Sequence, residues 1–244
     1  MGLIDRIRAG PIDLVKRVIY KKLIGPYRYR SPSGYDAARF WRDRLEKYGP
    51  SLRGVGDEGL SEEENRARHS ETSRILMKAL AGSDVRLPSA RVLEVGCGSG
   101  FYTKKLQEAG VQSLMGIDIT DALFPMLRTQ FRDYEFRVAD ITADPIVGEF
   151  DLILMIDVLE HIVTDVGLRN AVGHLRGALA PGGLLLLGPV MPRARRHLFY
   201  VRFWSTTEIR PLFSDLQELE PIACHGGYLM GFRDRGPTGR RATH

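Results

Sequence analysis

The amino-acid sequence predicts an α/β fold: a doubly wound, mostly parallel seven-stranded sheet with an antiparallel last strand, helices on both faces and an N-terminal helical extension. Two observations lead to this prediction. From residue 90 onward, short segments that are apolar throughout alternate with helical segments, which is typical of parallel strands covered by helices on both faces. The first of these strands continues directly into a glycine-rich loop and a helix, as at the ligand-binding edge of such sheets.

The predicted helices and strands follow one another in a regular order. Ser61 and Glu64 form a capping box, because the serine hydroxyl can accept from the amide of residue 64 while the glutamate reaches back, so a helix is expected over 62–80. The other elements are strands over 90–95, 113–119, 135–140, 150–159 and 182–190, and helices over 101–110, 121–131 and 165–179. Residues 213–233 then offer two closing strands, joined near Gly226, which we expect to pair antiparallel.

The chain is long enough to bury a full core. Its 244 residues and hydrophobic content of 43% favour one elaborated domain over two independent ones. We expect a basic N-terminal extension and lid segment over 1–60, the main domain over 61–235 and a flexible tail over 236–244. The two cysteines indicate a reducing, cytoplasmic setting, since a disulfide at Cys97 would block the approach of a ligand to the glycine loop.

The positive charge is concentrated at the N-terminus. The chain carries a net charge of +5, and residues 1–30 hold eight basic and two acidic side chains, so this segment carries +6 and the rest of the chain −1. Because apolar residues recur there at helical spacing, the segment is either a helix on a membrane surface or a solvated helix docked on its own domain. No apolar run is long enough to cross a bilayer, and no nucleic-acid partner is expected.

Three glycines, Gly96, Gly98 and Gly100, follow the strand over 90–95 at every second position. Such a loop brings backbone amides close to a ligand. The dinucleotide fingerprint G-x-G-x-x-G would require its third glycine where this chain has Phe101, and no G-K-[ST] ending of a phosphate-binding loop is present. Glu94 would repel the phosphates of a nucleotide, whereas a cationic ligand would tolerate it. The loop therefore favours a ligand that carries positive charge.

The loop resembles the first motif of class I S-adenosylmethionine-dependent methyltransferases, E/D-x-G-x-G-x-G, which the segment Glu94-Val95-Gly96-Cys97-Gly98-Ser99-Gly100 matches. The resemblance covers about residues 80–232. In that family an acid at the end of the second strand accepts from both ribose hydroxyls, which corresponds to Asp118. An acid that follows the third strand lies near the adenine amino group, which corresponds to Asp140. The resemblance implies S-adenosyl-L-methionine as cofactor, bound by Glu94, Gly96, Cys97, Gly98, Gly100, Asp118, Ile119, Asp140, Ile141 and Asp157.

Methyl transfer mainly requires that the acceptor atom be aligned and water excluded. In many small-molecule O-methyltransferases of this class a histidine at the position of His161 serves as general base; the alternative is that His161 only caps or packs against the neighbouring helix. Asp157, the second candidate catalytic residue, is a reasonable contact for the acceptor or for the amino group of the cofactor. Together with Glu160 these residues could hold a divalent ion such as Mg²⁺, but three ligands within five residues are too few to assign a metal site.

Residues 157–160, at the end of the fourth strand, indicate which kind of atom accepts the methyl group. Family members that methylate exocyclic amines or amides carry Asn/Asp-Pro-Pro-Tyr/Phe there, whereas this segment has neither proline nor an aromatic residue, so a hydroxyl oxygen is the expected acceptor. A small saccharide or glycoside is favoured; the alternatives are an aromatic secondary metabolite, a lipid-linked or RNA acceptor, or a non-catalytic membrane-associated homologue. Aromatic rings beside polar groups suit sugar faces, and the candidates for acceptor contact are Tyr35, Glu160, Arg195, His197, Tyr200 and Trp204.

Overall fold

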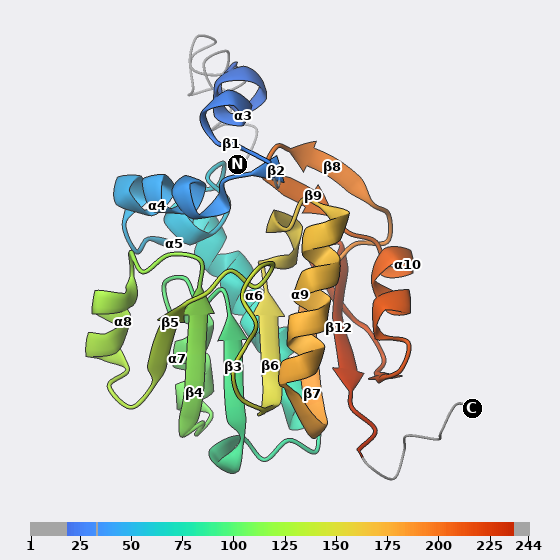
Figure 1. Ribbon diagram of the computed structural model, residues 1–244. Coiled ribbons are helices and arrows are strands. Elements are labelled where there is room, and N and C mark those ends of the chain that lie inside the picture. The colour runs from blue at the N-terminus through green and yellow to red at the C-terminus, as the bar shows by residue number, and fades with distance from the viewer. Residues whose placement is uncertain (1–18, 33, 237–244) are drawn as a thin grey trace.

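The computed structural model describes residues 19–32 and 34–236 and shows a central sheet between two layers of helices (Figure 1). The order of the strands across the sheet is β10-β12-β7-β6-β3-β4-β5, and β11 pairs with the same outer edge of β12 as β10 does. The strands are β3 (Arg91–Val95), β4 (Ser113–Asp118), β5 (Glu135–Val138), β6 (Phe150–Ile156), β7 (Leu179–Val190), β10 (Gln217–Glu218), β11 (Ile222–Cys224) and β12 (Gly227–Arg233).

The pairing of the strands confirms the predicted fold class. β5, β4, β3, β6 and β7 are all parallel to their neighbours, whereas β12 is antiparallel to β7. The two closing strands β11 and β12 form the expected antiparallel hairpin, with Cys224 opposite Gly227. The sheet therefore has seven positions across and an antiparallel strand beyond β7, as the alternation of apolar strands and helices predicts.

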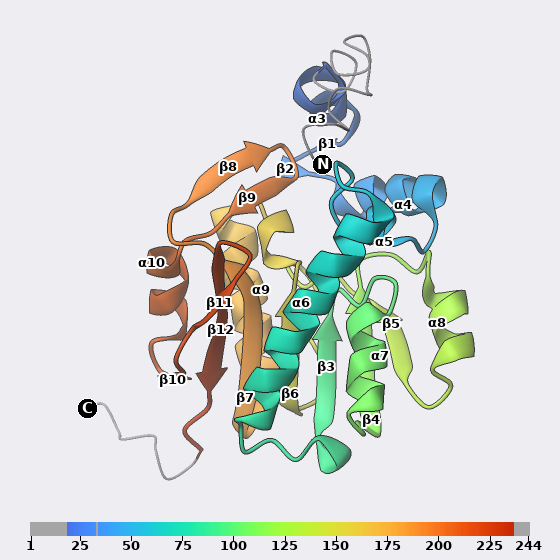
Figure 2. The same ribbon diagram turned by 180° about the vertical axis from the view of Figure 1, so that it is seen from behind.

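Helices cover both faces of the sheet. One face carries α9 (Asp165–Ala178) and α10 (Thr206–Ile209), and the other carries α6 (Glu62–Ala81) and α7 (Phe101–Glu108), as Figures 1 and 2 show from opposite sides. Each face has its own core cluster: Leu168, Leu175 and Phe213 pack on the first face, and Leu76, Leu106 and Leu127 on the second. The alternation of buried strands and amphipathic helices thus builds a core on each side of one sheet.

The start of α6 is set by its predicted capping box. The Ser61 hydroxyl accepts from the Glu64 amide at 3.1 Å, and the Ser61 amide donates to the Glu64 carboxylate at 2.8 Å. By contrast, α8 (Phe124–Gln130) begins three residues after the predicted start at Asp121. The Phe124 amide donates to the Asp121 carbonyl at 3.0 Å and closes a turn, and Pro125 occupies the first helical turn, where a missing N–H costs nothing.

The predicted N-terminal helical extension is present and lies above the carboxyl ends of the parallel strands (Figure 1). It contains a helix formed by η1 (Tyr20–Ile24) and α3 (Gly25–Arg28), short strands β1 (Arg30–Ser31) and β2 (Gly34–Tyr35), and helices α4 (Ala37–Tyr48) and α5 (Leu52–Val55). A hairpin of β8 (Arg195–Leu198) and β9 (Val201–Phe203) packs against it through the aromatic residues Tyr29, Phe40, Phe199 and Tyr200. Residues 1–18 of the predicted basic segment and 237–244 of the predicted tail lie outside the described residues.

Candidate active site

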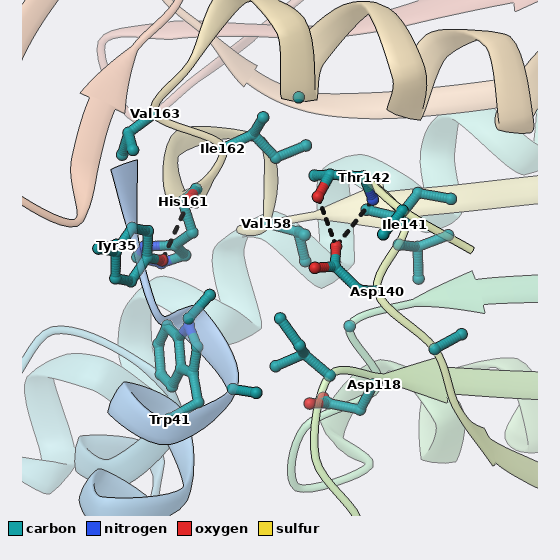
Figure 3. A pocket seen from close by; sticks show the side chains of 18 of the residues that line it. Tyr35, Trp41, Asp118, Asp140, Ile141, Thr142, Val158, His161, Ile162 and Val163 are labelled. Carbon is teal, nitrogen blue, oxygen red and sulfur yellow. Dashed lines mark hydrogen bonds between the residues drawn. The ribbon is translucent and has the colours of Figure 1, made fainter. Parts of the chain in front are cut away.

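A cavity of about 620 Å³ lies between the carboxyl ends of the parallel strands and the N-terminal extension. Its walls come from the loops after β3, β4, β5 and β6, from α9 and from residues of α4 and α5. Figure 3 shows Asp118 and Asp140 on one side of this cavity and Tyr35, Trp41 and His161 on the other. The cavity thus joins the carboxyl edge of the sheet, where ligands bind in such folds, to a second wall from the extension.

Two of the loop glycines, Gly96 and Gly98, line the cavity, and both have a backbone conformation that disfavours a side chain. Gly96 has a φ of 73°, and a Cβ on it would come within 2.2 Å of a Val158 methyl group. At Gly98 a Cβ would make only a tight contact of 3.3 Å with Val55 of α5, and the main constraint is the φ of 49°, which side chains disfavour. Gly100 differs: it is the cap of α7, and a Cβ there would meet the Leu127 and Phe131 side chains, so it serves helix packing.

Asp118 fixes the glycine loop from the end of β4. Its Oδ2 accepts from the Gly98 amide at 3.0 Å, and its Oδ1 accepts from the Thr120 amide at 3.3 Å. Burial raises the pKa of this carboxyl, while the hydrogen bonds from the two amides oppose the shift. The hydrogen bond to the Asp118 carboxylate therefore helps to fix the conformation of the glycine loop.

Asp140 closes the same wall after β5. Its Oδ1 accepts from the Thr142 amide at 2.8 Å and from the Thr142 hydroxyl at 2.7 Å, as Figure 3 shows. Ile119 and Ile141 line the cavity beside the two acids. This part of the lining therefore combines carboxylates with apolar side chains, which suits a flat ring with polar edges.

Three of the predicted cofactor residues lie behind the cavity wall and not on it. Glu94 is buried, and its Oε2 accepts from the Thr103 hydroxyl at 2.6 Å. No described residue bonds to its Oε1, and burial raises the pKa of the carboxyl to about 8. Cys97 is likewise buried beside β4, and burial raises the pKa of its thiol. With Gly100, these residues shape the loop; the other seven predicted residues line the cavity.

Asp157 stands at the end of β6 in a left-handed conformation, with a φ of 58° that non-glycine residues adopt rarely. Its amide donates to the Gly188 carbonyl at 2.8 Å, and its Oδ2 accepts from the Tyr102 hydroxyl at 2.9 Å. Neighbouring Glu160 has a buried Oε2 without a partner among the described residues, and burial followed by the charge of Asp157 raises its pKa to about 8. Glu160 does not line the cavity, although its carboxyl lies close enough to Asp157 for the two charges to interact.

His161 lines the cavity as a neutral ring. Its Nδ1 lies 3.0 Å from the Tyr200 carbonyl oxygen, which can only accept, so Nδ1 carries the proton and Nε2 is free to accept one. Burial lowers the pKa of the imidazole to about 4. The Trp41 ring meets it edge-on with centroids 4.8 Å apart, and the Tyr35 hydroxyl donates to the His161 carbonyl at 3.1 Å (Figure 3).

The chain resembles known methyltransferases in sequence and in fold. Residues 92–183 match a family profile described as a methyltransferase domain. Nodulation protein S from Sinorhizobium fredii is 28% identical over 162 residues, which cover 65% of this chain and 71% of that protein. A ubiquinone biosynthesis O-methyltransferase from Pseudomonas aeruginosa is 27% identical over 121 residues, 47% of this chain, and the chain spans only half the length of that relative.

Two solved structures have the same fold. The N-methyltransferase NodS from Bradyrhizobium japonicum, in complex with S-adenosyl-L-homocysteine, matches with a TM-score of 0.56 at 21% identity and covers 83% of this chain and 98% of its own. CalS10, a SAM-bound amino pentose methyltransferase from Micromonospora echinaspora, matches with a TM-score of 0.58 at 15% identity over 71% of this chain and 97% of its own.

Residues 92–183 thus match a methyltransferase domain, and the fold is the one that S-adenosylmethionine-dependent methyltransferases of class I share. The cofactor of this class is S-adenosylmethionine, and the residues present fit it. Backbone replaces side chains at Gly96 and Gly98, so a ligand can approach closely. The described lining contains Asp36, Asp118, Asp140 and Asp157 and no lysine or arginine, which suits a sulfonium cation.

The acceptor side of the methyltransferase cavity differs from the set expected from the sequence. Of the six candidates, only Tyr35 lines the cavity. Trp204 is buried in the core, where its Nε1 donates to the Ile162 carbonyl at 2.8 Å, and Tyr200 is buried in the aromatic cluster with Phe40. Arg195 and His197 are exposed on β8, outside the cavity. Arg195, His197 and Tyr200 do not line the cavity because they belong to the hairpin β8–β9, which packs against the extension.

Several lining residues carry no sequence signal of their own. Trp41 is one of several aromatic residues in the extension, and nothing in the sequence distinguishes it from Tyr48, which instead donates to Glu58 at 2.7 Å. Val158 and Val55 contact the glycine loop only through tertiary packing. Among residues 19–32 and 34–236, no group of three or more His, Cys, Asp or Glu is placed to hold a metal ion, and no helix is long and apolar enough to span a bilayer.

Proposed function

We propose that the chain transfers a methyl group from S-adenosylmethionine to a hydroxyl of a small polar acceptor, with a saccharide or glycoside favoured. The observation that carries this proposal is the neutral His161, whose Nε2 is free to accept a proton at the cavity wall. Because the pKa of this imidazole is lowered to about 4, the ring stays in the proton-accepting form through the neutral range.

The roles of the other residues follow from their places in the cavity. When bound, the cofactor supplies a methyl group on a sulfonium sulfur. Gly96 and Gly98 would carry its amino-acid end, Asp118 would accept from the ribose hydroxyls, and Asp140 would lie near the adenine. Asp157, held by the Tyr102 hydroxyl, would contact the amino group of the cofactor or the acceptor. These assignments cover five of the seven predicted residues that line the cavity, and the other two, Ile119 and Ile141, line it beside the two acids.

The acceptor wall supports a ring-shaped, uncharged acceptor. Trp41 and Tyr35 present aromatic surface next to His161, and such rings stack on the apolar faces of sugars. The described lining has no lysine or arginine to neutralise a phosphate or carboxylate group. The fold shared with an amino pentose methyltransferase agrees with a sugar-like acceptor. An RNA acceptor, with its phosphates, is disfavoured for the same reason.

The test of the proposed base is His161→Ala. A hydroxyl acceptor is first identified by screening methyl glycosides and catechols for S-adenosylhomocysteine formation. Turnover of His161→Ala on this acceptor should fall about a hundredfold or more. The affinity for S-adenosylhomocysteine, measured by calorimetry, should change less than about threefold, which shows that the cavity is intact. Turnover within about threefold of wild type would remove His161 from the reaction. Repeating the screen with a chelator tests the Mg²⁺ alternative.

A second candidate is an amine acceptor. The four aspartates of the cavity and the fold shared with the N-methyltransferase NodS both favour it. Matched acceptors that differ only in one group, such as methyl glucoside and its 2-amino counterpart, decide between the two. Methylation of the amine alone would replace the hydroxyl proposal while leaving the methyltransferase assignment unchanged.

A further inference from the structure

The first helix of the described chain exposes an apolar face. Five of the eight exposed large hydrophobic residues in the described part lie within nine positions: Ile19, Tyr20, Leu23, Ile24 and Tyr27. Ile19, Leu23 and Tyr27 are four residues apart in succession and therefore share one side of the helix. Leu23 and Tyr27 are 67% and 84% exposed, which is unusual for large apolar side chains placed side by side.

The other side of this helix is packed, so the exposed face has a defined direction. Gly25 is buried against the Phe199 ring at the tip of the hairpin β8–β9, where a Cβ would approach within 2.5 Å. Tyr29, directly after the helix, stacks on Phe199 with ring centroids 6.0 Å apart and donates to Asp43 at 2.9 Å. The apolar face consequently points away from the protein, at the end of the molecule where α3 projects (Figure 2).

Basic side chains lie beside the apolar face. Lys21, Lys22 and Arg30 form no ion pair with any described residue, and no acidic residue occurs between positions 19 and 35. The adjoining strand β8 adds the exposed Arg195 and Arg196. Burial, then the charges of Arg195 and Lys21, lowers the pKa of His197, while the charge of Asp57 opposes the shift, so Arg195 and Lys21 both lie near His197.

The same segment leads directly into the cavity. Ser31, Pro32 and Tyr35 follow the helix within seven residues of Arg28, and all three line the cavity wall. A surface that receives the apolar face would therefore lie beside the acceptor end of the cavity.

We propose that this N-terminal surface, formed by Ile19, Leu23, Ile24 and Tyr27 with Lys21, Lys22, Arg30, Arg195 and Arg196, docks on an anionic lipid bilayer. An exposed apolar helix face with basic residues at its margin binds at the boundary between acyl chains and head groups, and the basic residues are attracted to anionic lipid. A protein partner with an uncharged apolar groove would not account for the basic residues beside the face. This proposal does not depend on the acceptor or on the chemistry of the cavity.

The test is vesicle flotation of the full chain. Wild type should float with vesicles of phosphatidylcholine containing 30% phosphatidylglycerol in low salt, about tenfold less with phosphatidylcholine alone, and less as salt is raised. Leu23→Asp combined with Tyr27→Asp, and separately Lys21→Glu combined with Lys22→Glu, should each lower binding at least tenfold. S-adenosylhomocysteine affinity checks that these variants are folded.

Two control variants carry the same changes elsewhere. Val147→Asp alters an exposed apolar residue outside the N-terminal surface. Lys104→Glu with Arg132→Glu reverses the charge of two exposed cations outside it. Both variants should float as wild type does. Absence of wild-type flotation, or equal flotation of surface and control variants, overturns the proposal. So does light scattering that shows a dimer broken by Leu23→Asp with Tyr27→Asp, since the face would then cover a second copy.

Discussion

The hydrogen bond from the Gly98 amide to Asp118 in the cavity wall gives the first prediction. Asp118→Ala removes both acceptor oxygens of the loop, so S-adenosylhomocysteine should bind about ten- to a hundredfold more weakly, as expected for the loss of hydrogen bonds to a charged group. Calorimetric titration measures the change. Asp121→Ala, three residues on and exposed, is the matched control and should bind as wild type does. Equal affinities for the two variants would contradict the role given to Asp118.

At the scale of single residues, the sequence was informative where a backbone constraint and a charge coincide. Gly96, Gly98, Asp118 and Asp140 stand at strand ends, and the cavity wall contains all four. The acceptor wall was not predictable in the same way, because whether an aromatic or basic side chain enters a cavity depends on how a surface hairpin packs. Trp204 satisfies its N–H inside the core instead.

At the scale of elements, local signals placed the helix ends that have side-chain caps. The capping box of α6 gives a second prediction: Ser61→Ala should lower the free energy of unfolding by about 1 kcal/mol, because one amide of the first turn loses its acceptor. Urea denaturation measures this change. Ser70→Ala, exposed on the same helix, should leave stability unchanged or slightly raised, since alanine is the better helix former. A similar loss in both variants would show that the cap contributes nothing specific.

Elements whose ends depend on tertiary contacts were placed less well. The start of α8 is delayed by a turn closed at Asp121, and the two short strands β10 and β11 share one edge of β12. The order of the strands was not specified by any local signal either; it follows from parallel connections that wind outward on both sides of β3. Alternation of strands and helices predicts the architecture, whereas pairing partners come from the assembled sheet.

At the scale of the whole molecule, the cavity is built from two parts of the chain, the carboxyl edge of the sheet and the N-terminal extension. The loops after β3 to β6 supply the carboxylates and glycines, and the N-terminal extension supplies Tyr35 and Trp41 from above. Behind this edge the fold also buries two acidic groups, Glu94 and Glu160, and burial is the first cause of the raised pKa of each. Folding stability therefore depends on pH.

That dependence is the last prediction. The pKa of Glu94 rises from an ordinary 4.5 to about 8 in the folded chain, so the folded state binds the proton more tightly than the unfolded state does. The stability from this group is complete below pH 4.5 and is lost as pH rises toward 8, by an amount on the order of 5 kcal/mol. His161 acts in the opposite sense, because its lowered pKa makes stability fall as pH drops from 6.5 toward 4. Above pH 6.5 the buried glutamates therefore determine the slope.

Glu94→Gln isolates this contribution, since the amide oxygen can still accept from the Thr103 hydroxyl while the side chain no longer titrates. Urea unfolding at pH 6.5 and pH 8.5 should show a marked loss of stability for wild type and a clearly smaller loss for Glu94→Gln, with Glu160 responsible for what remains. Glu149→Gln, at an exposed position, should keep the wild-type slope. Parallel pH dependences for wild type and Glu94→Gln would mean that Glu94 is already ionised in the folded chain, with its Oε1 bonded to solvent that reaches behind the glycine loop.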